Sequence, residues 1–216
     1  MPKLIWDDTG KHLFETGVQK GVLYPQVKGA YPKGVVWNGL TSVTESPSGA
    51  ESNPHYADDI KYLNLVSAEE FGATVEAYTY PDEFANCDGS AEISPGILVG
   101  QQERQKFGLC YRTVLGNDTE GNAYGYKLHI IYNATASPSE KQYQTINDSP
   151  EAITFSWELS TTPTNVDGHK PTASLVIDST KVDETKLKKL EDKLYGTESE
   201  EASLPTPNEI IALLAA

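Results

Sequence analysis

The sequence contains few of the residues that most often carry chemistry or staple a fold. It has two cysteines, four histidines and one methionine in 216 residues. Two cysteines cannot build a disulfide framework; Cys87 and Cys110 could pair, although buried small hydrophobes are the more common role for isolated strand cysteines. Their spacing matches no zinc pattern, and the histidines are scattered along the chain. We therefore expect no metal ion and no cofactor.

Long apolar runs and an excess of positive charge are also missing. No run of about 18 apolar residues occurs, and the first residues lack the apolar core of a signal peptide, so we expect neither a membrane span nor ordinary export. The chain has 17 Lys and Arg against 31 Asp and Glu, a formal net charge of −14. This balance argues against a protein that grips phosphate backbones. Acidity is explained either by solubility or by a surface along which DNA must move without sticking.

What the sequence does contain is a series of short β-forming segments divided by turn signals, most densely from Lys61 to Asn133. Alternating aromatic and β-branched residues predict strands within 18–24, 34–43, 73–80, 97–101, 107–115, 124–134, 151–161 and 171–178. Between two of these, Ser67 and Glu70 have the spacing of a capping box, which predicts one turn of helix. Residues 81–84 predict a second short turn.

The C-terminal part has a different pattern. Asp183 is a good N-cap, and an apolar stripe with a terminal glycine follows it at Leu187, Leu190, Leu194 and Gly196. Glu184 and Lys188 add a favourable pair. This pattern predicts an amphipathic helix of three turns that packs on a sheet of its own subunit. A polar linker then leads to a short apolar segment that Thr206, Pro207 and Glu209 mark as helical. We therefore divide the chain into a β domain with an N-terminal arm, residues 1–196, and a linker with an apolar segment, residues 197–216.

Residues 45–59 predict a long polar loop. Structureless connections of this length are uncommon inside compact domains and are often functional when ordered. The prolines and the tyrosine would stiffen and anchor it, which favours a contact-making loop over a floppy excursion. The candidate contact residues are Glu45, Pro47, Glu51, Pro54, Tyr56 and Asp58.

No group of residues suggests catalysis. The carboxylate pairs Asp7–Asp8, Asp58–Asp59 and Glu69–Glu70 are adjacent, and neighbours on a strand point to opposite faces, so they fit solvated turns and caps better than acid/base partners. Residues 94–97 form a turn without a nucleophile motif, and His129 fits an ordinary sheet position. The sequence also lacks phosphate-binding and zinc-protease motifs. We expect a protein that is not an enzyme.

As a string, most of the chain resembles the major tail proteins, or tail tube proteins, of long non-contractile-tailed bacteriophages. The similar stretches are 17–25, 34–51, 56–65, 61–133, 145–163 and 170–181. The resemblance implies a mainly β fold of two packed antiparallel sheets closing toward a barrel, with a flanking α-helix near the C-terminus. The pattern of about ten short strands and one clear helix agrees with that fold.

The same resemblance implies a structural virion protein, made in the host cytoplasm. Its subunits would form homo-oligomeric rings, typically of six, that stack into a tube through which the genome is ejected. Expected partners are further copies of the chain and the tape measure, tail initiator or baseplate, and tail terminator proteins, while DNA passes without specific binding. The alternative is a β-sandwich carbohydrate-binding or adhesion module, which twelve tyrosines would suit. The resemblance implies contacts through sheet extension and through long loops between rings, and residues 45–59 are the candidate for such a loop.

Overall fold

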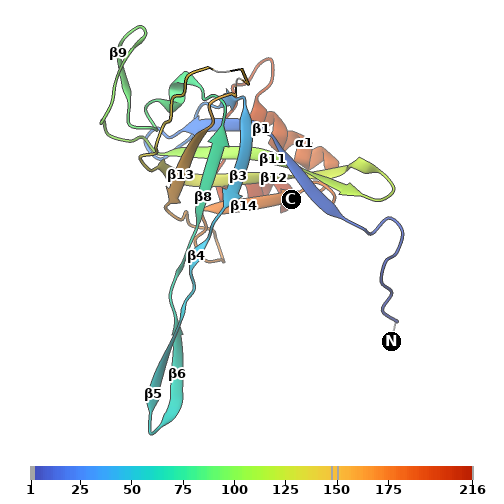
Figure 1. Ribbon diagram of the computed structural model, residues 1–216. Coiled ribbons are helices and arrows are strands. Elements are labelled where there is room, and N and C mark those ends of the chain that lie inside the picture. The colour runs from blue at the N-terminus through green and yellow to red at the C-terminus, as the bar shows by residue number, and fades with distance from the viewer. Residues whose placement is uncertain (1–2, 147, 150, 216) are drawn as a thin grey trace.

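The computed structural model describes residues 3–146, 148–149 and 151–215, and its architecture is mainly β (Figure 1). One antiparallel sheet of eight strands forms the body, in the order β2-β1-β11-β12-β13-β8-β3, with β14 beside β12. Its strands are β1 (Phe14–Pro25), β2 (Val35–Trp37), β3 (Leu40–Glu45), β8 (Gly72–Ala77), β11 (Phe107–Asn117), β12 (Gly121–Ala136), β13 (Phe155–Thr161) and β14 (Ser174–Asp178). This confirms the predicted fold class, with the two layers formed by two parts of one bent sheet.

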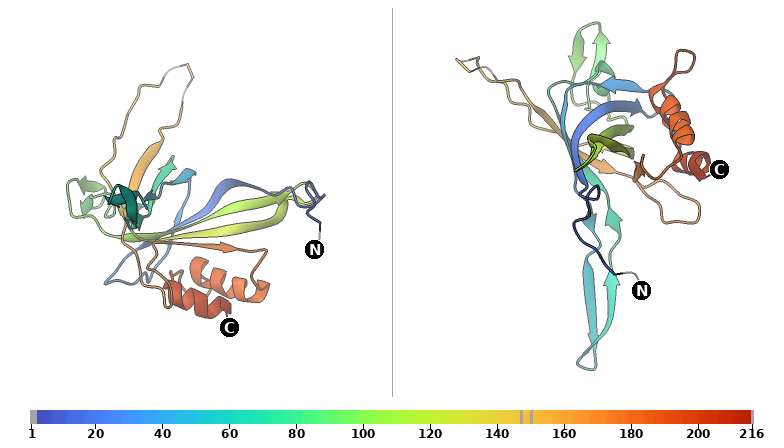
Figure 2. Two further views of the ribbon diagram at one scale, coloured as in Figure 1. Left: turned by 90° about the horizontal axis from the view of Figure 1, so that it is seen from below. Right: turned by 90° about the vertical axis from the view of Figure 1, so that its right-hand side faces the viewer.

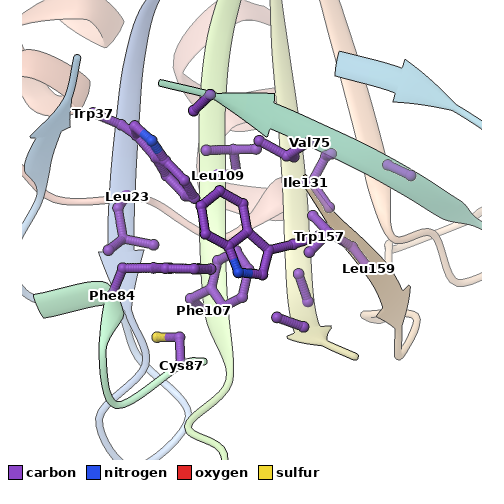
Figure 3. Packing of buried hydrophobic residues seen from close by; sticks show 14 of the residues in the cluster. Leu23, Trp37, Val75, Phe84, Cys87, Phe107, Leu109, Ile131, Trp157 and Leu159 are labelled. Carbon is purple, nitrogen blue, oxygen red and sulfur yellow. The ribbon is translucent and has the colours of Figure 1, made fainter. Parts of the chain in front are cut away.

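The concave side of the bent sheet encloses an aromatic core. Figure 3 shows Trp157 of β13 at its centre, facing Trp37 and Phe84, with Leu109 of β11 and Val75 of β8 around it. The Trp157 ring lies 5.7 Å from the Trp37 ring and 5.0 Å from the Phe84 ring, both in edge-on arrangements that aromatic pairs prefer. Strands from both ends of the sheet order supply this core, so its burial holds the sheet in its curled form.

The opposite face of β1, β11 and β12 is covered by two helices (Figure 2), α1 (Glu184–Tyr195) and α2 (Pro207–Ala215). The predicted stripe of α1 is buried on the sheet of its own subunit, as expected. Asp183 caps the helix by accepting a hydrogen bond from the Lys186 backbone N–H at 3.1 Å. Lys188 pairs with Asp192 on the following turn.

Residues 197–215 pack against the body. The Thr206 backbone N–H donates to Glu209 Oε2 at 2.8 Å, and the Glu209 backbone N–H donates to Thr206 Oγ1 at 3.4 Å, which is the predicted box. Ile210 of α2 is 1% exposed and belongs to the cluster beneath α1. Ala216, the last residue of the predicted apolar segment, lies outside the described residues.

Several predicted elements are corrected by the structure. The strand predicted at 34–43 is divided into β2 and β3 at Gly39, whose φ of 78° favours glycine and whose added Cβ would come 3.0 Å from Thr79. The helical turn predicted at Ser67–Glu70 is wrong, because Glu69–Glu70 form the short strand β7 and the Ser67 hydroxyl accepts from the Glu51 backbone N–H. The turn at 81–84 is confirmed as a 3₁₀ helix, Asp82–Phe84.

Two further observations concern side chains singled out in the sequence. Cys87 and Cys110 are both free and buried, which resolves the choice between pairing and packing. Burial raises the pKa of each thiol to about 12, so both are held in the unreactive protonated form.

In the described part of the chain, no helix is both long and apolar enough to cross a bilayer.

Candidate assembly surfaces

The most prominent feature outside the body is a long β-hairpin, residues 48–70, which we call the arm (Figure 1). Its base pairs β4 (Ser48–Gly49) with β7 (Glu69–Glu70), and its length pairs β5 (Ser52–Ala57) with β6 (Ile60–Val66). Asp58 and Asp59 form the tip with φ of 50° and 63°, the left-handed backbone of a two-residue hairpin turn. The polar loop predicted at 45–59 is therefore wrong in form, because most of it is the first strand of this hairpin.

The arm is exposed along its whole length. Every residue of β5 and β6 is exposed, and the main contacts of these strands are with each other. Large apolar side chains nevertheless lie along it, including Tyr56 at 69% and Tyr62 at 70% exposure. A contiguous apolar surface left in water is characteristic of a protein–protein contact site.

The structure divides the six candidate contact residues of the sequence. Pro54 and Tyr56 lie on β5, Asp58 at the tip, and Glu51 between the two paired segments of the arm. Pro47 precedes β4, and Glu45 ends β3 within the body. The residues that sequence reasoning missed are on the second strand of the arm: Ile60, Tyr62, Leu63, Leu65 and Val66. The available signal was the β-forming run Ile60–Val66 directly after the Asp58–Asp59 turn.

Glu45 takes part in a cluster that fixes the strand leading into the arm. The Tyr111 hydroxyl donates to Glu45 Oε1 at 2.6 Å, and His129 Nδ1 lies 3.3 Å from the same oxygen. The His129 ring stacks on Tyr111, with ring centroids 4.8 Å apart and planes 6° apart. On its other side, His129 Nε2 lies 3.4 Å from Glu15, which also binds Lys127. The cluster thus connects β3 to β1, β11 and β12.

The electrostatics of this cluster favour ionised carboxylates. The hydrogen bond with His129, aided by the Tyr111 hydroxyl, holds the pKa of Glu45 below its ordinary value despite partial burial. Partial burial also opposes ionisation of Glu15, but hydrogen bonds from Lys127 and Thr113 hold its pKa below the ordinary value. His129 therefore lies between two carboxylates, Glu45 of β3 and Glu15 of β1. Its position on strand β12 is the ordinary sheet position that the sequence predicted.

A second exposed hairpin lies at the end of the molecule opposite the arm (Figure 1). It pairs β9 (Ala91–Ser94) with β10 (Ile97–Val99) and exposes Ile93, Ile97 and Leu98. The chain leading into it is held by Asp88, whose carboxylate accepts from Trp157 Nε1 at 3.2 Å and from Lys141 Nζ at 2.5 Å. The hairpin therefore projects from a segment that is tied to the aromatic core.

The N-terminal residues form a third exposed apolar segment. Leu4, Ile5 and Trp6 are each more than two-thirds exposed. The segment joins the body through the Gly10 backbone N–H, which donates to Asp118 Oδ1 at 2.9 Å on the β11–β12 turn. The division of the chain into a β domain with an N-terminal arm stays a prediction.

The structure brings together no catalytic constellation from the sequence candidates. Asp7 and Asp8 lie near the start of the chain, Asp58 and Asp59 at the tip of the arm, and Glu69 and Glu70 at its base. Among the described residues, no three His, Cys, Asp or Glu side chains are placed to hold a metal ion. An open groove of about 760 Å³ beside the base of the arm is lined by small and apolar residues, with Glu69 and Lys170 as its charged members.

Three comparisons with known proteins were made. No family model and no curated protein matches the chain. Among solved structures, a chain in the cryo-EM structure of the anti-feeding prophage (AFP) baseplate, 6-fold symmetrised, aligns over 80% of this chain and 97% of that chain. The two share 9% identity, with a TM-score of 0.38, a value too low for a shared fold to be inferred.

Proposed function

We propose that the chain is a structural virion protein, the major subunit of a phage tail tube, and that its copies form rings that stack end to end. The observation that carries this proposal is the arm: an ordered hairpin that places apolar side chains in water, away from the body. Isolated two-stranded hairpins are at best marginally stable in water, so an arm of this kind gains most by packing on a partner. The sequence resemblance to major tail proteins supports further copies of the chain as that partner.

The free edges of the molecule fit repeated assembly. Both strands of the arm have an unpaired edge, and β2 and β3 end the strand order of the main sheet. Unpaired edges are templates for pairing with another chain, and closure into a ring would use them. A head-to-tail contact between rings does not close, so stacking continues as a tube. The formal charge of −14 suits a channel through which DNA slides, because an acidic wall offers phosphates no binding site.

Electron microscopy of the purified protein tests the proposal directly. We expect rings or tubes in negative stain, and species larger than the 23.6 kDa chain in sedimentation at high concentration. Added salt should speed assembly, because acidic subunits repel one another until charges are screened over about 8 Å. A chain that stays monomeric at all concentrations and salt levels would contradict the proposal. Monomers that bind immobilised glycans would instead support the carbohydrate-binding alternative.

A further inference from the structure

A register shift places three large apolar residues of β6 on one face of the arm, while Tyr56 and Val66 lie on the other face. Cross-strand partners share a face of a hairpin, and here Asn53 pairs with Leu65, His55 with Leu63, and Ala57 with Ile60. Residues 53, 55 and 57 alternate regularly, so Leu65, Leu63 and Ile60 lie on one face. Regular alternation along β6 would separate Ile60 from Leu63. The irregularity between His55 and Tyr56 removes that separation.

We call the surface made by Ala57, Ile60, Leu63 and Leu65 the arm face. Neither β5 nor β6 contains an Asp or Glu, although the chain as a whole is strongly acidic. The acidic residues of the arm lie at its tip and around its base: Glu51, Asp58, Asp59, Glu69 and Glu70. The arm face can therefore approach a second acidic subunit without placing like charges against each other.

The β9–β10 hairpin exposes a second set of apolar side chains at the other end of the same molecule, on both of its faces, because Ile97 and Leu98 are neighbours on β10. Ile93, Ile97 and Leu98 are 66%, 54% and 56% exposed. The one acidic side chain on these two strands, Glu92, accepts a hydrogen bond from the Gly96 backbone N–H at 2.9 Å, so part of its bonding capacity is used within the hairpin. Figure 1 shows the two hairpins projecting in opposite directions from the body.

We propose that the arm face of one copy docks on the β9–β10 hairpin of the next copy, with Ile60, Leu63 and Leu65 packing against the apolar side chains that this hairpin exposes. This inference rests on the proposed function and identifies the two surfaces that meet between rings. The occupant is a second copy because a displacement along the long direction of the molecule brings one apolar hairpin to the other. Two different surfaces on opposite ends make a heterologous contact, which repeats without closing.

Complementation between two damaged proteins tests this pairing. One variant carries Leu63→Glu and Leu65→Glu on the arm face, and the other carries Ile97→Glu and Leu98→Glu on β10. Each should fold, because all four side chains are exposed in the single subunit. Each alone should lose stacking by at least about tenfold in association, as expected when central apolar contacts are lost. In a mixture, the intact arm of the second variant meets the intact β10 of the first, so the two co-sediment in a 1:1 complex that grows no further.

The matched control is Asn64→Glu, a charge of the same kind on the opposite face of the same strand, which should stack as the original protein does. Variants that stack normally on their own would place the contact elsewhere and overturn the inference. A mixture whose components stay apart would show that the two surfaces do not meet and would overturn it as well. In either case, tubes of the unaltered protein would leave the proposed function standing.

A disulfide trap examines the same contact where stacking is weak. Protein with Leu65→Cys is mixed with protein with Leu98→Cys under mild oxidation, and a covalent dimer of the two is expected. The natural thiols at Cys87 and Cys110 are buried and do not compete. Cross-linking of Leu65→Cys only to itself would indicate an arm-to-arm contact and overturn the inference. If the proposed function itself is wrong, the unaltered protein will not associate at all. That result differs from both cross-linking results.

Discussion

Two strands of this molecule, β8 in the body and β6 in the arm, have opposite relations between composition and burial. Strand β8 has the sequence GATVEA and alternates between buried and half-buried residues, whereas β6 has the sequence IKYLNLV and is exposed throughout. The more apolar strand is the one in water. Burial in the body is set by the curled sheet and the aromatic side chains that fill it. The exposure of β6 leaves an apolar strand in water, as contact sites for another chain do.

Removing the central side chain of the core should produce the largest loss of stability. Trp157 is fully buried and packs against Trp37, Phe84 and Tyr80. We expect Trp157→Ala to reduce the free energy of unfolding by about 3–5 kcal/mol. The substitution removes buried apolar area and also leaves a cavity in the core. Chemical denaturation measures this loss.

The matched substitution in the arm is Tyr62→Ala. It should change the free energy of unfolding by less than about 0.5 kcal/mol, because the ring is 70% exposed. Equal losses from Trp157→Ala and Tyr62→Ala would mean that the arm and the body unfold as one unit, and the comparison between them would fail.

The same contrast explains which parts of the structure could be predicted from the sequence. Local chemistry determined α1, since Asp183, the leucine stripe and Gly196 each act within a few residues. The strands β11 and β12 were found for the same reason, by alternation along the chain. The arm was mistaken for a loop because Ser52–Ala57 contains Ser, Asn, Pro and His, and only pairing with Ile60–Val66 makes it a strand.

The cluster around Glu45, at the end of the strand that leads into the arm, could not be predicted from the spacing of its residues in the sequence. Glu45, Tyr111 and His129 lie far apart in sequence and meet only because β3 approaches β11 and β12 when the sheet curls. Ser67 was misread for a related reason. Its hydroxyl serves the facing strand of the arm instead of a helix N-terminus, and a single sequence window cannot distinguish the two partners.

A local contact in the body should have a smaller effect than the aromatic core. We expect Asp183→Ala to reduce the free energy of unfolding by about 1 kcal/mol, because it removes the side chain that accepts from the Lys186 backbone N–H. Asp183→Asn, which can still cap, should lose much less, and thermal unfolding of the three proteins compares them. If Asp183→Asn is as damaging as Asp183→Ala, the cap is not the source of the effect.

Glu45, which lies between the body and the arm, should make the stability of the protein depend on pH in the acid range. The pKa of Glu45 is lower in the folded protein than its ordinary value of 4.5, so its interactions stabilise the fold above about pH 4.5 and are lost as the pH falls through the folded pKa. Glu45→Gln removes this ionisation. Its melting temperature should therefore fall less between pH 5 and the acid limit, at about pH 3, than that of the original protein. If the melting temperature of Glu45→Gln falls as much in acid as that of the original protein, the cluster of Glu45 with His129 contributes nothing to the pH dependence.

The largest deletion should have only a small effect on stability. Residues 48–69 can be replaced by a short Gly-Ser turn, because the Ser46 backbone N–H already donates to the Gly72 carbonyl at 2.8 Å and brings the two ends of the arm together. The main contacts of β5 and β6 are with each other, so their removal takes almost nothing from the cores. A shorter loop also costs less entropy to close. We therefore expect a melting temperature within a few degrees of the original, a shift of about 1 kcal/mol or less for a chain of this size, together with complete loss of stacking in the microscope. A large drop in melting temperature would show that the arm contributes to the stability of the body. Normal tubes would show that the arm is not needed for assembly. Either result would contradict the distinction between a body that folds by itself and an arm that joins subunits.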